Sequence, residues 1–229
     1  MVGSQPAPLR VGVGQTAIKA VVVDIGGVLE RVDDASWPQQ WIARWESRRG
    51  LPAGHVADRI AGHAPPDDVA TGRITEAEVR DLYAAALGLD VAETDAMWAE
   101  MWDAYCGELD VAMRDFVAGL RPAYRTAILS NSADGARREE QRRYDFEGLV
   151  DEVVYSHEVG IAKPDPAVFR LTEQLLGVAR REVVFIDDHD GHVEAARRHG
   201  WYAVLHTDTQ QTIAEVTALL TPPQPPRRS

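Results

Sequence analysis

Polar side chains follow three apolar runs in this chain, each at the point where the run ends. Asp24 follows the first run, Ser130 the second, and the pair Asp187 and Asp188 the third. The runs cover residues 18–23, 126–129 and 183–186. Short apolar runs bounded by turn residues are typical of buried parallel strands. Because ligand sites in such sheets lie beyond the carboxyl ends of the strands, we expect these side chains to share one crevice.

The acidic residues at these strand ends could do chemistry. An aspartate directly after a strand, such as Asp24, is either a helix cap or a nucleophile. The adjacent carboxylates of Asp187 and Asp188 repel each other unless a cation lies between them. A bound metal therefore explains this pair better than the alternative, a solvated turn that leads into the next helix.

The pattern of apolar residues predicts a doubly wound α/β fold. A fourth apolar run at residues 202–205 adds a strand, and helical patterns lie between the runs. The predicted helices cover residues 110–120, 166–176, 193–199 and 212–220. Asp165 and Pro166 supply an N-cap and a first-turn proline, while Gly177 and Gly200 stand where helices commonly end. Strands that alternate with helices are typical of a parallel sheet with helices on both faces.

Residues 33–106 interrupt this alternation and predict a helical domain inserted after the first strand. Two aromatic stripes recur in it at helical spacing: Trp37, Trp41 and Trp45, then Trp98, Trp102 and Tyr105. Each stripe occupies one face of a helix, and we expect the stripes to pack helices of the insertion together. An aromatic roof over a substrate, or a contact with a second subunit, is the alternative, since clustered tryptophans also mark interfaces.

The interruption divides the chain into a core domain of residues 17–32 and 107–220 and an α-helical domain of residues 33–106. Residues 1–16 mix Gly, Pro, Gln and Ser, and residues 221–229 are rich in Pro. Both ends are therefore predicted to be flexible. A chain of 229 residues is long enough for one domain with a large insertion.

The chain is acidic, with 24 basic and 36 acidic residues and a formal net charge of −12. This charge opposes nonspecific binding to nucleic acid or anionic membranes. No apolar run approaches the roughly 20 residues that span a bilayer, and the start does not resemble a secretory signal. The single cysteine, Cys106, excludes an internal disulfide and fits a buried thiol in a reducing compartment. We therefore predict a cytoplasmic protein that binds neither nucleic acid nor membrane.

Four segments taken together resemble the haloacid dehalogenase (HAD) superfamily of hydrolases. They are Asp24-Ile25-Gly26-Gly27-Val28-Leu29, Leu129-Ser130-Asn131-Ser132, Lys163-Pro164-Asp165-Pro166 and Phe185-Ile186-Asp187-Asp188. Each segment is weak alone, but their order and their positions at strand ends are specific. The insertion resembles the helical cap (C1, subfamily IA-like) of phosphatases in that family, and residues 72–78 are similar to a segment often found in such caps. The resemblance covers residues 17–220.

This resemblance implies a magnesium-dependent phosphatase that acts on a small phosphorylated metabolite. Asp24 would attack phosphorus and form an aspartyl phosphate, which splits one difficult displacement into two easier ones. Mg²⁺, which prefers oxygen ligands, would be held by Asp24, Asp187, Asp188 and the backbone carbonyl of Gly26. The cap would choose the substrate.

The resemblance also assigns three residues to the phosphoryl group. Lys163 would offset the negative charge on Asp24 and on the phosphate, and Ser130 would donate a hydrogen bond to a phosphoryl oxygen. Asn131 would donate to the same phosphate or to the rest of the substrate. An exposed lysine and a capping serine are the alternatives that the residues alone leave open.

Gly26 departs from the family pattern, because phosphatases of this family usually carry a second aspartate there as acid and base. Loss of a positioned acid or base typically lowers a rate on the order of 10²–10⁴-fold. The leaving group could be good enough to need little protonation, His157, His189 or His192 could substitute, or the protein could be a weak catalyst. In the last motif, Asp190 is expected to cap the next helix rather than support a metal ligand.

Two other functions stay open from the sequence. One is a 2-haloacid dehalogenase, in which the same aspartate attacks carbon without a metal; the adjacent pair Asp187 and Asp188 argues against it. The other is a non-catalytic or weakly active binding or regulatory protein, which Gly26 keeps open. A homodimer formed through the cap is a further possibility.

Overall fold

The computed structural model describes residues 17–32 and 36–221. The predicted flexible ends, residues 1–16 and 221–229, lie outside the described residues apart from Thr221, as do residues 33–35 of the predicted helical domain. Within the described part, no helix is long and apolar enough to cross a membrane.

The centre of the fold is a 5-stranded sheet of strand order β5-β4-β1-β6-β7 in which every neighbouring pair is parallel. The strands are β1 (Ala20–Val23), β4 (Arg125–Ser130), β5 (Glu152–Tyr155), β6 (Val183–Asp187) and β7 (Tyr202–Leu205). The four predicted strands are all present, and the doubly wound α/β fold is confirmed. The edge strand β5 was not predicted from the sequence.

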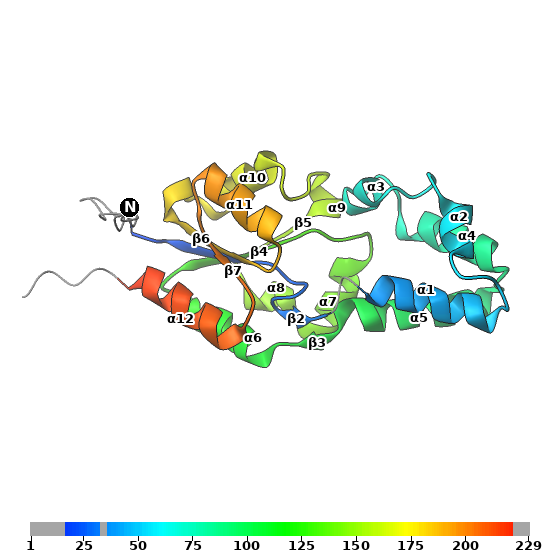
Figure 1. Cartoon of the computed structure of the whole chain (residues 1–229). Helices are drawn as coiled ribbons and strands as arrows, with labels where there is room; N and C mark the ends of the chain where they lie inside the picture. Colours follow the sequence, from blue (N-terminus) through cyan, green and yellow to red (C-terminus); the bar gives the residue numbers. More distant parts are fainter. Residues whose placement is uncertain (1–16, 33–35, 222–229) are drawn as a thin grey trace, which may run out of the picture.

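Helices cover both faces of this sheet (Figure 1). They are α6 (Val111–Leu120) and α12 (Thr209–Leu220) on one side, and α10 (Pro166–Leu176) and α11 (Asp190–His199) on the other. Alternate side chains of β1 explain the two layers: Val21 and Val23 belong to one hydrophobic cluster and Ala20 and Val22 to the other. All four side chains are buried, as expected for a central parallel strand.

The predicted ends of helix α10 are confirmed. Asp165 is its N-cap, and the Asp165 side chain accepts a hydrogen bond from the backbone N–H of Ala167. Gly177 ends the helix in the left-handed conformation at φ 68°, which favours glycine. Gly200 ends α11 in the same way, at φ 106°.

The start of α11 differs from the prediction. The helix begins at Asp190, earlier than residue 193, and its N-cap is His189, whose Nδ1 accepts a hydrogen bond from Gly191 N at 3.1 Å. The expectation that Asp190 caps the helix is therefore wrong. Asp190 is the first helical residue, where a carboxylate interacts favourably with the helix dipole.

The segment from residue 36 to 106 forms five helices that extend beyond the carboxyl ends of the strands (Figure 1). They are α1 (Trp37–Arg48), α2 (His55–Ile60), α3 (Pro66–Ala70), α4 (Glu76–Leu87) and α5 (Val91–Cys106). The chain enters this segment after β2 (Glu30–Arg31) and leaves it before β3 (Glu108–Leu109). These two short strands pair antiparallel at the base of the segment.

The helical segment contacts the rest of the chain at two short helices of the sheet domain. These are α7 (Ala136–Tyr144), which follows β4, and α9 (Ser156–Val159); a third short helix, α8 (Phe146–Leu149), packs on α7. Helix α3 lies against α9, and α5 against α7. A Cβ atom built on Gly72 would fall 2.1 Å from the carbonyl oxygen of His157, so the close approach of the two segments there requires glycine.

The two aromatic stripes pack α1 against α5, as predicted. The rings of Trp41 and Trp98 meet at 6.0 Å between centroids and 72°, and those of Trp37 and Tyr105 at 6.2 Å and 88°. Such edge-to-face contacts are favourable for aromatic pairs. Cys106, at the end of the second stripe, is fully buried as predicted, and burial raises the pKa of its thiol.

Trp41→Ala tests how far these helices depend on the aromatic contact. The Trp41 side chain is 3% exposed and its indole N–H donates to the carbonyl oxygen of Met97. We expect the free energy of unfolding, measured in urea, to fall by about 3–5 kcal/mol. As control, Val91→Ala changes a side chain that is 78% exposed on α5 and should stay within about 0.5 kcal/mol of the parent. Equal losses in both variants would contradict this account.

Candidate active site

A buried lysine joins two carboxylates at the carboxyl edge of the sheet. The ammonium of Lys163 lies 2.7 Å from Asp24 Oδ2 and 2.7 Å from Asp187 Oδ2. Asp24 follows β1 and Asp187 ends β6, and these strands are neighbours in the sheet. The Lys163 and Asp187 side chains are fully buried, and that of Asp24 is 11% exposed. The sequence therefore correctly predicted that these residues lie together.

The charges of this group do not balance. Burial alone would lower the pKa of Lys163, but Asp24 and Asp187 hold it above its usual value, so the ammonium is charged. Burial opposes ionisation of Asp187 as well, yet Lys163 and His192 hold its pKa well below the usual range. Burial raises the pKa of Asp24, and Asp187 raises it further, while Lys163 opposes both. With both carboxylates ionised, the group has one negative charge more than Lys163 compensates, which a cation would offset.

Asn131 holds the backbone of Lys163 in place. Its side-chain oxygen accepts from Lys163 N, and its amide nitrogen donates to Lys163 O, both at 2.8 Å. One amide N–H of Asn131 is thus used by the protein, and the other is left for the predicted contact with a phosphate. Ser130, the last residue of β4, is buried next to it.

Asp187 also receives donors from the loop that follows it. The backbone N–H of His189 donates to Asp187 Oδ1 at 2.8 Å, and Nδ1 of His192 lies 3.2 Å from each carboxylate oxygen. If Nδ1 carries the proton, Nε2 is left as the other reactive nitrogen of His192. Two of the three predicted substitute histidines thus lie beside the carboxylates.

His157, the third candidate, has a different environment. Its Nδ1 lies 2.8 Å from Ser132 Oγ and its ring packs on Tyr155 at 5.6 Å. Burial lowers the pKa of His157, which favours the neutral ring. This histidine belongs to the contact with the helical segment rather than to the group around Lys163.

The oxygen atoms near Asp24 suit a divalent cation. Donor atoms of Asp24, Asp187 and His192 come within 4.8 Å of one another. Asp188 lies directly against the turn after Asp24, because a Cβ built on Gly27 would fall 2.1 Å from Asp188 Oδ2. Position 27 therefore requires glycine for two reasons: its φ of 70° favours glycine, and a side chain there would clash with the Asp188 carboxylate. Closely spaced carboxylates with an excess negative charge are the donor set that Mg²⁺ prefers.

These groups surround one cavity of about 230 Å³. Its walls are formed by residues from the carboxyl ends of β1, β4 and β6 and the turns after them, from β2 and from three helices: Asp24, Gly26, Glu30, Tyr105, Ser130, Asn131, Glu140, Asp188, His189 and His192. Seven of the predicted site residues thus line one cavity, and the predicted Lys163 and Asp187 are buried next to Asp24. Glu30 and Glu140 were not predicted from the sequence.

Glu140 is a buried carboxyl group that was not predicted from the sequence. Its Oε2 accepts a hydrogen bond from the Tyr155 hydroxyl, and its Oε1 is buried without a hydrogen-bond partner. Burial raises the pKa of Glu140 to about 8, so this carboxyl holds a proton at neutral pH. Burial, together with Glu140 and Glu30, raises the pKa of Tyr105 and keeps this phenol neutral. This wall of the cavity thus presents less negative charge than its composition suggests.

The fold and the site together define a doubly wound α/β protein with a carboxylate and lysine centre at the carboxyl edge of its sheet. Residues 18–200 match the family model of the haloacid dehalogenase-like hydrolases. The chain therefore belongs to this family of hydrolases.

Comparison with individual proteins agrees with this assignment. The chain is 29% identical over 235 residues to bifunctional epoxide hydrolase 2 of the pig (Sus scrofa), which covers 92% of this chain and 41% of that protein. The chain thus spans less than half the length of that relative. It is 23% identical over 210 residues to D-ribitol-5-phosphate phosphatase of Bacteroides thetaiotaomicron, covering 89% of this chain and 98% of that protein.

The fold also matches solved structures. One is the crystal structure of a HAD family enzyme from Bacteroides thetaiotaomicron in complex with magnesium and inorganic phosphate. The TM-score is 0.68, the identity is 23%, and the match covers 83% of this chain and 95% of that one. At this identity the likeness establishes the shared fold.

Lys163→Met tests the charge balance of the site. Without the ammonium, Asp24 and Asp187 are buried with no cation, so we expect a loss of about 3–5 kcal/mol in the free energy of unfolding at pH 7. Because the pKa of Asp187 is depressed in the folded state, its ionisation stabilises the parent protein at pH values above the unfolded-state pKa of about 3.9. This stabilisation is lost as the pH falls from there toward the folded-state pKa. The difference between variant and parent should therefore shrink toward acid.

Urea unfolding with a chelator present, between pH 7 and the acid limit of folding, measures both effects. Lys19→Met is the matched control, because Lys19 also lies 2.7 Å from a carboxylate, that of Glu182, but is 61% exposed. Exposed ion pairs contribute little, so this control should change stability only slightly. A pH-independent loss in Lys163→Met would contradict the charge argument.

Proposed function

We propose that the chain is a magnesium-dependent phosphatase that hydrolyses a small phosphorylated substrate through an aspartyl phosphate on Asp24. The observation that carries this proposal is the group of Asp24, Lys163 and Asp187, in which a buried ammonium is shared by two carboxylates. The phosphatase among its relatives, which matches over almost its whole length, supports the same reaction class.

In this proposal Asp24 is the nucleophile. A carboxylate oxygen forms a bond to phosphorus while the bond to the leaving oxygen breaks, and water later hydrolyses the acyl phosphate. Lys163 stabilises the added negative charge on the phosphoryl oxygens, and Ser130 and Asn131 donate hydrogen bonds to them. Since Asn131 also clamps the Lys163 backbone, it positions the ammonium as well.

The metal would be held by Asp24, Asp188 and the carbonyl oxygen of Gly26, with Asp187 behind them. Gly26 and Asp188 line the cavity beside Asp24, and the excess negative charge of the site favours a divalent cation. Mg²⁺ bound there would supply positive charge to the phosphate and lower its repulsion from Asp24. The chain's own residues carry every other step.

The absence of a carboxylate at Gly26 shapes the reaction. Of the three substitute histidines, His189 and His192 line the cavity and are the better candidates for moving a proton to or from the leaving oxygen. Without an aspartate at this position, we expect esters with acidic leaving groups to react fastest, because they need little protonation.

We further propose that residues 33–106 act as the cap that selects the substrate. The chain would form a homodimer through this segment and be located in the cytoplasm. A dehalogenase is disfavoured, because a metal-free site gains nothing from the adjacent Asp187 and Asp188. A non-catalytic binding protein is the outcome if no ester is turned over.

Asp24→Asn removes the nucleophile but keeps the shape of the side chain. We expect Mg²⁺-dependent phosphate release from a panel of phosphomonoesters to fall at least about 10³-fold, and a chelator to abolish it in the parent. Asp115→Asn, at an aspartate that is 64% exposed on α6, is the control and should keep the parent rate. Metal-independent conversion of 2-haloacids, lost in Asp24→Asn, would replace the phosphatase by a dehalogenase.

Gly26→Asp restores the carboxylate found in related phosphatases. Gly27 has positive φ but Gly26 does not, so an aspartate fits the backbone at position 26. We expect kcat for an alkyl phosphate to rise by about 10²-fold or more, and kcat for p-nitrophenyl phosphate to rise less, because that leaving group needs little protonation. The double variant Asp24→Asn with Gly26→Asp should be inactive. An unchanged ratio between the two esters would show that the proton is supplied elsewhere.

A further inference from the structure

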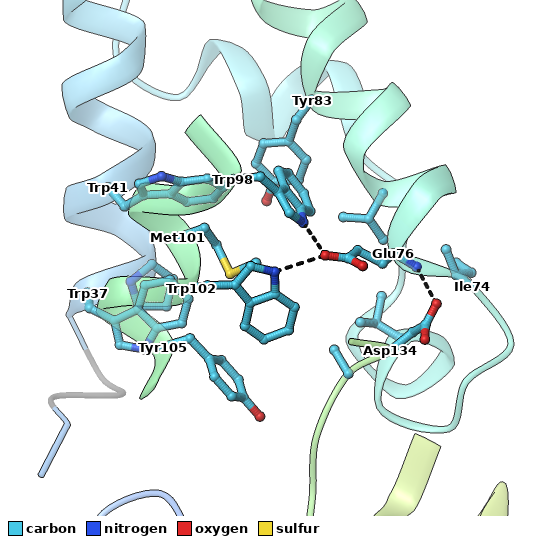
Figure 2. A pocket seen from close by; sticks show the side chains of 14 residues that line it. Trp37, Trp41, Ile74, Glu76, Tyr83, Trp98, Met101, Trp102, Tyr105 and Asp134 are labelled. Carbon is cyan, nitrogen blue, oxygen red and sulfur yellow. Dashed lines mark hydrogen bonds between the residues drawn. The ribbon is translucent and has the colours of Figure 1, made fainter. Parts of the chain in front are cut away.

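A second cavity lies between the helical segment and the loop that follows β4, as Figure 2 shows. Its volume is about 230 Å³ and its walls are nearly all apolar. Six aromatic rings form most of the wall: Trp37, Trp41, Tyr83, Trp98, Trp102 and Tyr105. Protein interiors are normally close-packed, so an open space of this size among large rings is a feature to be explained.

Three of these rings have their indole N–H bound by the protein. Trp98 and Trp102 each donate their indole N–H to Glu76 Oε1 at 2.9 Å, as Figure 2 shows, and Trp41 donates to Met97 O at 3.2 Å. These three indoles therefore have no free N–H to offer to the cavity, which fits its nearly all apolar walls. Such a surface gains free energy when an apolar group replaces water on it.

This aromatic pocket adjoins the cavity around Asp24. Tyr105 lines both cavities, so its ring is a shared wall. Ala133 and Asp134 line the aromatic pocket and come directly after the segment that supplies Ser130 and Asn131 to the other cavity. A molecule with its phosphate beside Asp24 could extend past Tyr105 into the aromatic pocket.

Charge fixes which end of such a molecule enters the pocket. Two carboxylates lie at its rim, those of Glu76 and Asp134. Glu76 is held by the two indoles and by Arg138, at 3.0 and 3.1 Å, and Asp134 Oδ2 accepts from Glu76 N at 2.9 Å. No Lys or Arg is among the described residues that line the pocket, so it offers a phosphate no cationic partner, whereas Lys163 lies beside Asp24 at the other cavity.

A contact with another subunit does not explain the pocket. Trp41 is 3% exposed, and Trp98 and Trp102 are 5% exposed, so these rings are already covered within one chain. The surface is also concave. An engineered apolar cavity of about 150 Å³ binds benzene, so a pocket of this volume holds a group larger than one ring.

We propose that the aromatic pocket is the subsite for an apolar organic group of the substrate, so that the chain acts on phosphomonoesters of apolar alcohols. This rests on the phosphatase function proposed above. The test compares phenyl phosphate with 4-butylphenyl phosphate, whose leaving phenols are nearly equal in acidity. The ratio of their kcat/KM values therefore reports the butyl group and not the ease of bond cleavage.

We expect the parent protein with Mg²⁺ to favour 4-butylphenyl phosphate at least about tenfold, as is usual for an apolar group in a complementary pocket. Val79→Trp, which fills the pocket from α4, should bring the ratio close to one. Met101→Ala removes apolar surface from the pocket wall and does not fill the pocket, and it should lower the ratio as well. Val91→Trp, the same substitution as the first at a side chain that is 78% exposed, should keep the parent ratio.

Calorimetric titration with 4-butylphenol, which carries no phosphate, separates this proposal from the phosphatase function. Binding by the parent and by Val91→Trp, but not by Val79→Trp, supports the subsite even if no ester is hydrolysed, in which case only the phosphatase proposal fails. A parent ratio near one, or equal ratios in the two tryptophan variants, overturns the subsite while leaving the phosphatase intact. Failure of the parent to bind 4-butylphenol overturns it too.

Discussion

The site depends on one buried ammonium group that binds two carboxylates at once. Lys163 can meet Asp24 and Asp187 only if β1 and β6 are parallel neighbours whose carboxyl ends lie level, which the register of the sheet provides. The loop before α10 must also be fixed, and Asn131 does this from β4 by binding the Lys163 backbone. The three strands at the centre of the sheet are therefore each tied to the same lysine, two through its ammonium and one through its backbone.

Much of this could be predicted because buried parallel strands and helix ends leave local signals. The apolar runs placed Asp24 and Asp187 at strand ends, and Asp165, Gly177 and Gly200 marked helix boundaries through their own backbone requirements. Strand β5 was missed because its four residues, Glu152–Tyr155, include a glutamate and lie at the sheet edge. The cap of α11 was misassigned because His189 and Asp190 can both accept a backbone N–H, and only the helix start decides between them.

Side-chain direction was the part that the sequence could not supply. Glu139 and Glu140 are adjacent in a helix rich in arginine and glutamate, yet Glu139 forms ion pairs at the surface while Glu140 turns into the cavity wall. The aromatic stripes identified two packed helices, but not the space left between them, because a void depends on the third helix, α4, as well. Such features arise from packing between elements that are distant along the chain.

Glu76 gives the helical segment a property beyond packing. One carboxylate accepts the indole N–H groups of Trp98 and Trp102 and also binds Arg138 of α7, so it belongs at once to the helical segment and to the sheet domain. Indole emission responds to the charge and hydrogen bonding around its nitrogen. Any movement of α7 away from Glu76 changes the field at both rings, so the protein contains its own optical reporter of how its two parts are docked.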